Sequence, residues 1–296
     1  MPNRQHRLAA LLTAYCFLSA GAGARVTIPN PPPPMIDFQT SSVPLPAPAA
    51  GRKPQPPPLT PISPLAPETP HEPGMYARIG FISDFDAVNA DAASGNYMVN
   101  VTAWTGTFGA GIGNAATLSL SSAALNADAR TPAAAHTDSF RLNVLSAAAI
   151  LRAHGSLDFP LHWSFFDAGD TNYHYGAASL RRTYRNARAQ GGVEITGGGD
   201  VPSTLGALLH AEYQPSRDLI LAAEYHGSDP FKNVPNIVIP RRLTAAGFSP
   251  CTDCETDSLS LAVRFVTAGG FIISLGVYDA ADLDVPMGLV HYAFEN

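Results

Sequence analysis

The chain has 296 residues, of which 14% are charged and 46% hydrophobic, and its formal net charge is −6. This length suits one large all-β domain with appended segments, and the acidic balance argues against a nucleic-acid partner, which requires a concentrated basic face. No apolar run reaches the roughly 18 residues that a transmembrane helix needs.

The first 24 residues have the three parts of an export signal. Arg4 and Arg7 give a positive start, Leu8 to Leu18 form an apolar stretch, and Ala22-Gly23-Ala24 is a small-x-small cleavage site. We expect this signal peptide to be removed near Ala24, together with Cys16. The alternative is a short N-terminal helix of the mature protein.

Residues 25–73 hold 17 of the 27 prolines. Proline lacks an amide hydrogen and has a fixed φ, so this segment forms neither helix nor sheet. We expect a disordered periplasmic linker that acts as an extended tether. A proline-rich ligand for a partner protein is the alternative.

From residue 74 to residue 296 the dominant pattern is period two. In 203–213, for example, Leu205 and Leu209 fall on one face and His210 and Glu212 on the other. Runs of about ten residues are long enough for tilted strands to cross a bilayer, so the pattern predicts an antiparallel transmembrane β-barrel of about twelve strands in the outer membrane. The expected strands are 76–83, 96–112 with a bulge near Gly106, 115–124, 139–153, 159–168, 172–184, 189–197, 203–213, 219–226, 257–266, 270–279 and 287–295.

The lengths of the connections favour a membrane barrel, in which short periplasmic turns alternate with long external loops. Residues 214–218 are a short turn, whereas 125–138 and 227–256 are expected to be external loops. The last strand, 287–295, alternates into Phe294 and resembles the closing strand of outer-membrane barrels, although two residues follow the phenylalanine. An ordinary last strand of a soluble sheet is the alternative.

Polar residues of the alternating strands are expected to line the lumen. Two carboxylates beside two imidazoles are also compatible with a general acid/base or metal site, but a wall facing water is what a wide barrel requires. A second group, basic, lies at the end of the strand 172–184, and alternation can place only part of it in the lumen. The lumen candidates are His210, Glu212, Glu224, His226 and Arg264, and the basic cluster is Arg181, Arg182, Arg185 and Arg188.

Two further groups have a possible chemistry. Cys251 and Cys254 are spaced Cys-x-x-Cys, and in an exported chain we expect a local disulfide in a loop, with no zinc site, because no close ligands complete one. His162, Ser164 and Asp167 contain the residue types of a hydrolase triad, but Asp167 falls on the opposite face and no glycine elbow frames Ser164.

The segment from Ala211 to Gly227 reads as an EYxPxxxLxLxAEY-like hairpin, and Val263-Arg264-Phe265 leading to Gly276-Val277-Tyr278 is a looser copy. This pattern resembles the repeated barrel hairpins of the YjbH family, over about seventy residues of the chain. The resemblance implies an exported β-barrel associated with exopolysaccharide, with outer-membrane lipid, polysaccharide and periplasmic export or assembly proteins as partners.

The sequence therefore predicts a non-enzymatic outer-membrane barrel without cofactor or bound metal, involved in export or surface handling of a polysaccharide through a polar lumen. Three alternatives stay open: a general porin, a soluble secreted β-protein that binds saccharide or protein, and a barrel-embedded lipid hydrolase centred on Ser164.

Overall fold

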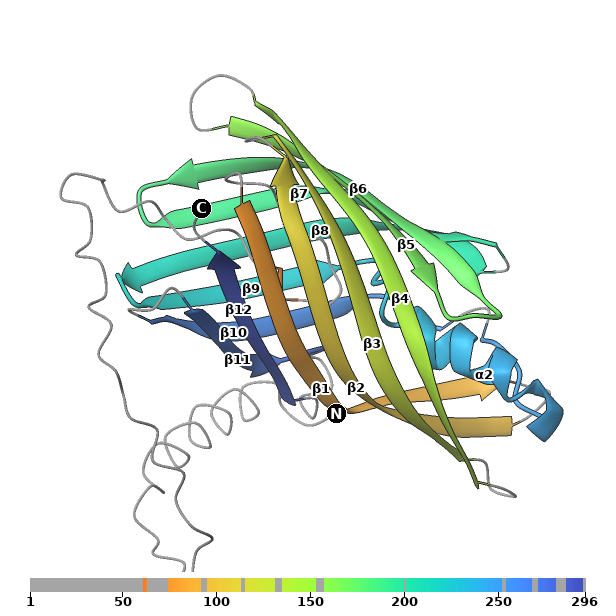
Figure 1. The fold of residues 1–296 in the computed structure, drawn as a ribbon. Coiled ribbons are helices and arrows are strands. Elements are labelled where there is room, and N and C mark those ends of the chain that lie inside the picture. The colour runs from red at the N-terminus through yellow and green to blue at the C-terminus, as the bar shows by residue number, and fades with distance from the viewer. Residues whose placement is uncertain are drawn as a thin grey trace, which may run out of the picture. The chain divides into compact units, whose positions relative to one another are not determined.

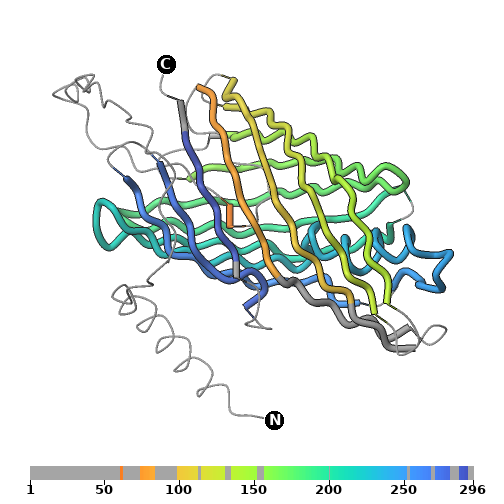
Figure 2. The backbone as a smooth tube through the Cα atoms, turned by 60° about the horizontal axis from the view of Figure 1, so that its bottom comes forward, coloured from red at the N-terminus to blue at the C-terminus, as the bar shows by residue number. Residues whose placement is uncertain are grey.

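In the computed structural model the chain closes into a barrel of twelve antiparallel strands, in which each strand pairs with its neighbours in sequence and β1 pairs with β12. The structure describes residues 61–62, 74–91, 95–112, 115–130, 135–152, 157–199, 201–251, 254–267, 271–280 and 286–294, with side chains omitted at 84–91, 95–98, 152, 286 and 293–294. Figures 1 and 2 show the strands as a continuous wall. The expected signal peptide lies outside the described residues, as does the linker except for Pro61 and Ile62.

Antiparallel hydrogen bonding closes the wall, because Met75 pairs with Phe294 and Ile82 pairs with Met287 across the first and last strands. The strands are β1 (Gly74–Asp91), β2 (Gly95–Ile112), β3 (Ala116–Arg130), β4 (Ala135–Arg152), β5 (Leu157–Asp167), β6 (Asn172–Tyr184), β7 (Ala187–Gly198), β8 (Val201–Ser216), β9 (Leu219–His226), β10 (Ser258–Val266), β11 (Phe271–Val277) and β12 (Pro286–Phe294). The all-β fold and the number of strands predicted from the sequence are confirmed.

We call the end of the barrel where β2–β3, β8–β9 and the other even-to-odd pairs connect the turn end, and the opposite end the loop end. The outer surface carries a belt of exposed apolar side chains, which lies in the turn-end part of β2 to β4 and reaches nearer the loop end on β7 and β8. Leu205, for example, is 77% exposed on the face that the alternation predicted to be apolar. The belt includes Ile79, Trp104, Phe108, Leu118, Leu120, Leu145, Leu161, Trp163, Val193, Ile195, Leu205, Leu209, Leu221, Leu261 and Phe265.

On β2 to β4 the apolar face changes sides along the strand. Near the turn end of β3, Leu118 and Leu120 point outward and Ser119 and Ser121 inward, whereas farther along Leu125 points inward. The outward side chains of this far part form a polar ladder, in which Ser139 donates to Asn126 at 2.8 Å, Thr137 to Asp128 at 2.6 Å and Ser122 to Asn143 at 3.2 Å. On β2 to β4, the part of the wall nearer the loop end is thus polar outside and apolar inside, as in a water-soluble barrel.

This reversal explains one wrong prediction. Residues 125–138 were expected to be an external loop, but β3 and β4 stay paired from Leu125–Phe140 to Arg130–Ala135. The strands reach 15 and 18 residues, beyond the roughly 9–11 that a tilted strand needs to cross a bilayer. The bulge expected near Gly106 is also wrong: Gly106 pairs regularly with Ile79, and the irregularity lies between Ile82 and Phe85 of β1.

The long β9–β10 connection does not stay outside the barrel. It contains a π-helical turn η1 (Val234–Val238), a helix α2 (Ile239–Arg242) and a 3-10 turn η2 (Thr244–Ala246). The residues of η1 are all buried, and its three aliphatic side chains belong to one apolar cluster with inward side chains such as Val101, Leu125 and Leu142. We call residues 229–242 the inner segment; Figure 1 shows it at one end of the barrel, beside β4. The prediction that 227–256 is entirely an external loop is therefore wrong. Among the described residues, no helix has the length and apolar character to cross a membrane.

Candidate functional site

A chain of alternating carboxylates and imidazoles lies along the inner face of strands β7 to β9. His226 binds Glu194 of β7 through Nδ1 at 2.8 Å and Glu224 through Nε2 at 3.0 Å. The other oxygen of Glu224 lies 2.8 Å from Nδ1 of His210, whose Nε2 lies 3.3 Å from Glu212. The register explains the arrangement, because His210 on β8 pairs with Glu224 on β9 and every second residue points inward.

Cations and neutral donors complete the two ends of this buried network. At one end Arg264 of β10 pairs with Glu212, and Nη1 of Arg188 lies 3.7 Å from the same carboxylate. At the other end Glu194 accepts hydrogen bonds from the Tyr175 hydroxyl at 3.0 Å and from the Ser228 amide at 2.9 Å. Each carboxylate therefore has a cationic or polar partner, as burial of an ionised group requires.

The lumen candidates are thus on the inner side of the wall, but they do not face open water. His210 is 5% exposed and Glu224 3% exposed. The sequence missed Glu194 and Tyr175, although Gln190, Glu194 and Thr196 share the inward parity of β7 and are all buried. Within the described residues, no group of three or more His, Cys, Asp or Glu side chains is arranged to hold a metal ion.

The basic cluster is divided between the two faces of the wall. Arg181 points inward and donates to Asp158 at 2.7 Å, and Arg188 joins the buried network. Arg182 and Arg185 are exposed, and Arg185, in the β6–β7 turn at φ 50°, lies 5.3 Å from the Tyr184 ring. No single basic site results.

The residues of the hydrolase alternative are not assembled as a triad. Ser164 is fully buried with its hydroxyl 2.8 Å from that of Ser146. Asp167 lies on the opposite face, where its carboxylate accepts the Gly169 amide at 2.9 Å. Because Asp167 and Ser164 are on opposite faces of the wall, the Asp167 carboxylate cannot orient a histidine beside Ser164.

A second group of contacts fastens the start of the inner segment. Asp229 accepts hydrogen bonds from the hydroxyls of Tyr278, at 2.7 Å, and Ser258. Burial raises the pKa of Tyr278 well above its ordinary value and the charge of Asp229 raises it further, so the phenol stays protonated and donates. Lys232 forms an ion pair with Asp279. Gly206 lets the backbone at Gly227 approach β8 closely, because a Cβ at residue 206 would lie 2.4 Å from the Gly227 carbonyl carbon.

The end of the inner segment is held at the loop end of the wall. Nε of Arg242 donates to Asp138 at 2.7 Å, its Nη1 lies 3.4 Å from Asp170, and its guanidinium stacks 4.7 Å from the Phe140 ring. These side chains are about a quarter exposed or more, so the contacts are accessible to water. They form a latch between the inner segment and the strands β4 and β5–β6.

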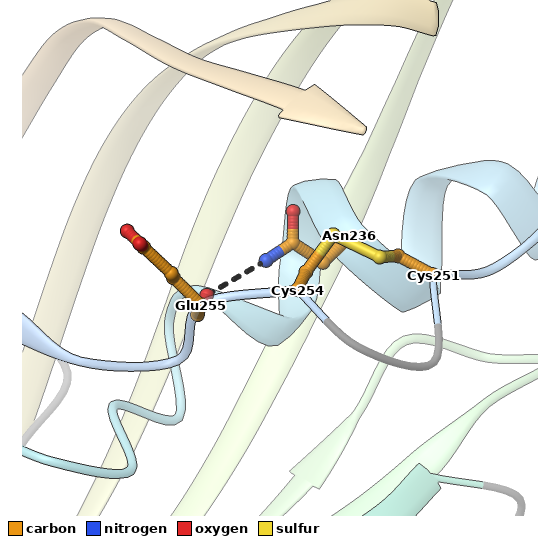
Figure 3. The surroundings of a disulfide bond; sticks show 4 residues. All are labelled: Asn236, Cys251, Cys254 and Glu255. Atoms are coloured by element: carbon orange, nitrogen blue, oxygen red, sulfur yellow. Dashed lines mark hydrogen bonds between the residues drawn. A yellow bond between two sulfur atoms is a disulfide. The ribbon is translucent and has the colours of Figure 1, made fainter. Parts of the chain in front are cut away.

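Cys251 and Cys254 form a disulfide on the return path to β10 (Figure 3). The Cys251 amide donates to the Asn236 carbonyl at 2.8 Å, and the Asn236 side chain donates to the Glu255 carbonyl at 3.2 Å. The disulfide loop is therefore tied to η1, although a ring of this size removes little chain entropy by itself.

No protein-family model matches the chain, and no curated protein matches it. Among solved structures, the chain is similar to the translocator domain of the autotransporter NalP from Neisseria meningitidis, with a TM-score of 0.45 and 10% identity over 75% of this chain and 88% of that chain. The resemblance to the YjbH family, over about seventy residues from Ala211 to Tyr278, stays a prediction.

The buried network predicts a strong asymmetry between single and paired substitutions. Arg264→Met should lower the free energy of unfolding by roughly 3–5 kcal/mol, because it leaves Glu212 charged and short of its main cation. The double variant Arg264→Met/Glu212→Gln should recover much of that loss. Urea unfolding of the refolded barrel, followed by tryptophan fluorescence, measures both; a double variant no more stable than Arg264→Met would contradict the coupling.

Proposed function

We propose that this chain is a non-enzymatic outer-membrane β-barrel that is closed at rest by its own inner segment. The observation that carries the proposal is the belt of outward apolar side chains around a closed wall. A water-soluble barrel has no reason to expose Trp104, Phe108 and Leu205 together, whereas a lipid-facing surface requires such residues.

The outer surface fits such a location. The apolar belt suits the hydrocarbon layer, and the polar ladder on the far part of β3 and β4 suits water beyond it. In this orientation the loop end faces outward, and the inner segment closes the external half of the interior. A general porin is disfavoured, because the inward side chains of η1 and of the facing strands are buried against each other.

The finer role, surface handling or export of a polysaccharide, depends on the hairpin resemblance of residues 211–227. A passive polar lumen does not fit the filled interior. Passage of a polymer would require the inner segment to leave the apolar cluster, and the Arg242 latch is the water-accessible contact that resists this movement.

The membrane location is tested by charge on the belt. Leu209 is 55% exposed at the predicted lipid surface, and arginine there should hinder assembly, since it costs roughly 2–4 kcal/mol at the bilayer midplane. Ser216→Arg, in the exposed end of β8, is the matched control and should assemble normally. Carbonate washing of membranes and a heat-modifiable gel shift measure insertion; a wild-type chain released by carbonate would remove the proposal.

Closure by the inner segment is tested by conductance. Arg242→Glu replaces attraction to Asp138 and Asp170 by repulsion, which should favour the open state by about 1–2 kcal/mol, a factor of roughly 5–30. Single-channel recordings in planar bilayers should show rare openings for the wild type and frequent ones for Arg242→Glu. The charge swap Arg242→Asp/Asp138→Arg should restore closure, and Arg217→Glu in the β8–β9 turn should change nothing. Large steady conductance of the wild type would show that the barrel is an open pore.

The polysaccharide role is tested in cells. A deletion of the gene should lower the amount of polymer outside the cells and raise the amount trapped in the envelope, and the wild-type gene should reverse both changes. Unchanged polymer together with impaired uptake of small solutes would leave the barrel intact as a proposal and remove the export role.

A further inference from the structure

Ile62 of the proline-rich segment lies inside the barrel, although it precedes the start of β1 at Gly74. The side chain is 1% exposed and belongs to the same apolar cluster as Phe231 and Val234 of the inner segment. Pro61 and Ile62 fall in one compact unit with the barrel, which spans Pro56–Asn296. A plain spacer has no reason to bury an isoleucine in this position.

The backbone of Ile62 is held as well as its side chain. Its amide donates to Oε2 of Glu224 at 3.2 Å, and the same carboxylate binds His210 and His226. Glu224 is 3% exposed, so the hydrogen bond is shielded from water and has a charged acceptor, which makes it stronger than an ordinary amide bond. Glu224 thereby joins the N-terminal segment to the buried network.

The local sequence suits a docked extended chain. Ile62 follows Pro61, and Ser63-Pro64 comes next. Proline fixes its own φ and restricts the preceding residue to extended conformations, so less conformational entropy is lost when this stretch is ordered. Prolines have no amide hydrogen, so Ile62 and Ser63 carry the two backbone donors of Pro61-Ile62-Ser63-Pro64.

We propose that the barrel interior contains a binding site for the chain's own proline-rich segment, with the Ile62 side chain as the apolar anchor and the Glu224 carboxylate as the acceptor for its amide. In this proposal Pro61 and Ile62 share the barrel interior with the inner segment. This inference goes beyond the proposed function and does not depend on the membrane location or on any transported substrate.

Hydrogen exchange of the complete mature protein, read by mass spectrometry with fragmentation to single residues, tests the site. The Ile62 amide should exchange at least about 100-fold more slowly than in an unstructured peptide. Glu224→Ala should reduce this protection by about tenfold or more, because the charged acceptor is lost. Ser260→Ala is the matched control: Ser260 pairs with Glu224 in the register and is equally buried, and its removal should leave Ile62 protection unchanged.

A second measurement keeps the network intact in case Glu224→Ala does not fold. Ile62→Cys should react with a maleimide-polyethylene glycol reagent at least about tenfold more slowly than Ser216→Cys, because the reagent must enter a closed interior. The native cysteines of the mature chain are oxidised to each other, so the reaction reports the new thiol. Exchange of the wild-type Ile62 amide at the unstructured rate, or equal reaction of the two thiols, would overturn the proposal.

Discussion

Closure of the hydrogen-bonded ladder between β1 and β12 is the constraint on which the rest of this structure depends. A sheet with free edges leaves rows of unpaired amides and carbonyls, which an apolar environment does not tolerate, and closure removes both edges at once. Once the wall is closed, the parity of each residue decides whether its side chain points outward or into a confined interior. The apolar belt and the buried network are two consequences of the same geometry.

The interior of a closed wall contains protein, water or empty space. In this barrel two parts of the chain lie inside it, the inner segment and Ile62. The loop half is lined by aliphatic side chains of β2 to β4, which would be exposed to water in an empty barrel. The inner segment covers them and takes part in a continuous apolar cluster. Burial of η1 thus has the hydrophobic origin of an ordinary protein core, while its ends are fixed by polar contacts at Asp229 and Arg242.

The buried carboxylate–imidazole network is the polar part of the inner lining, on strands β6 to β10. Charged groups in a shielded interior cost free energy unless each is paired, and here five strands, β6 to β10, supply the partners. The network also touches both occupants of the interior, through the Ser228 amide next to the inner segment and through the Ile62 amide. Glu194 and Glu224 therefore connect the wall to the segments that it encloses.

The amino-acid pattern by itself determined the strand number, the antiparallel order and the facing of residues such as Leu209 and His210, because period-two alternation is a local property of the chain. The apolar residues of β3 change parity between Leu120 and Leu125, and by itself this change was compatible with the end of a strand, so that only the continued pairing with β4 shows that the strand goes on. Likewise Val234 to Pro240 is simply an apolar stretch within a long connection, and only the closed wall, with its aliphatic lining, decided that this stretch is buried inside. The pairing of Glu194 with His226 and of Ile62 with Glu224 joins residues 32 and 162 positions apart, and contacts of that range arise only when the tertiary structure brings their segments together.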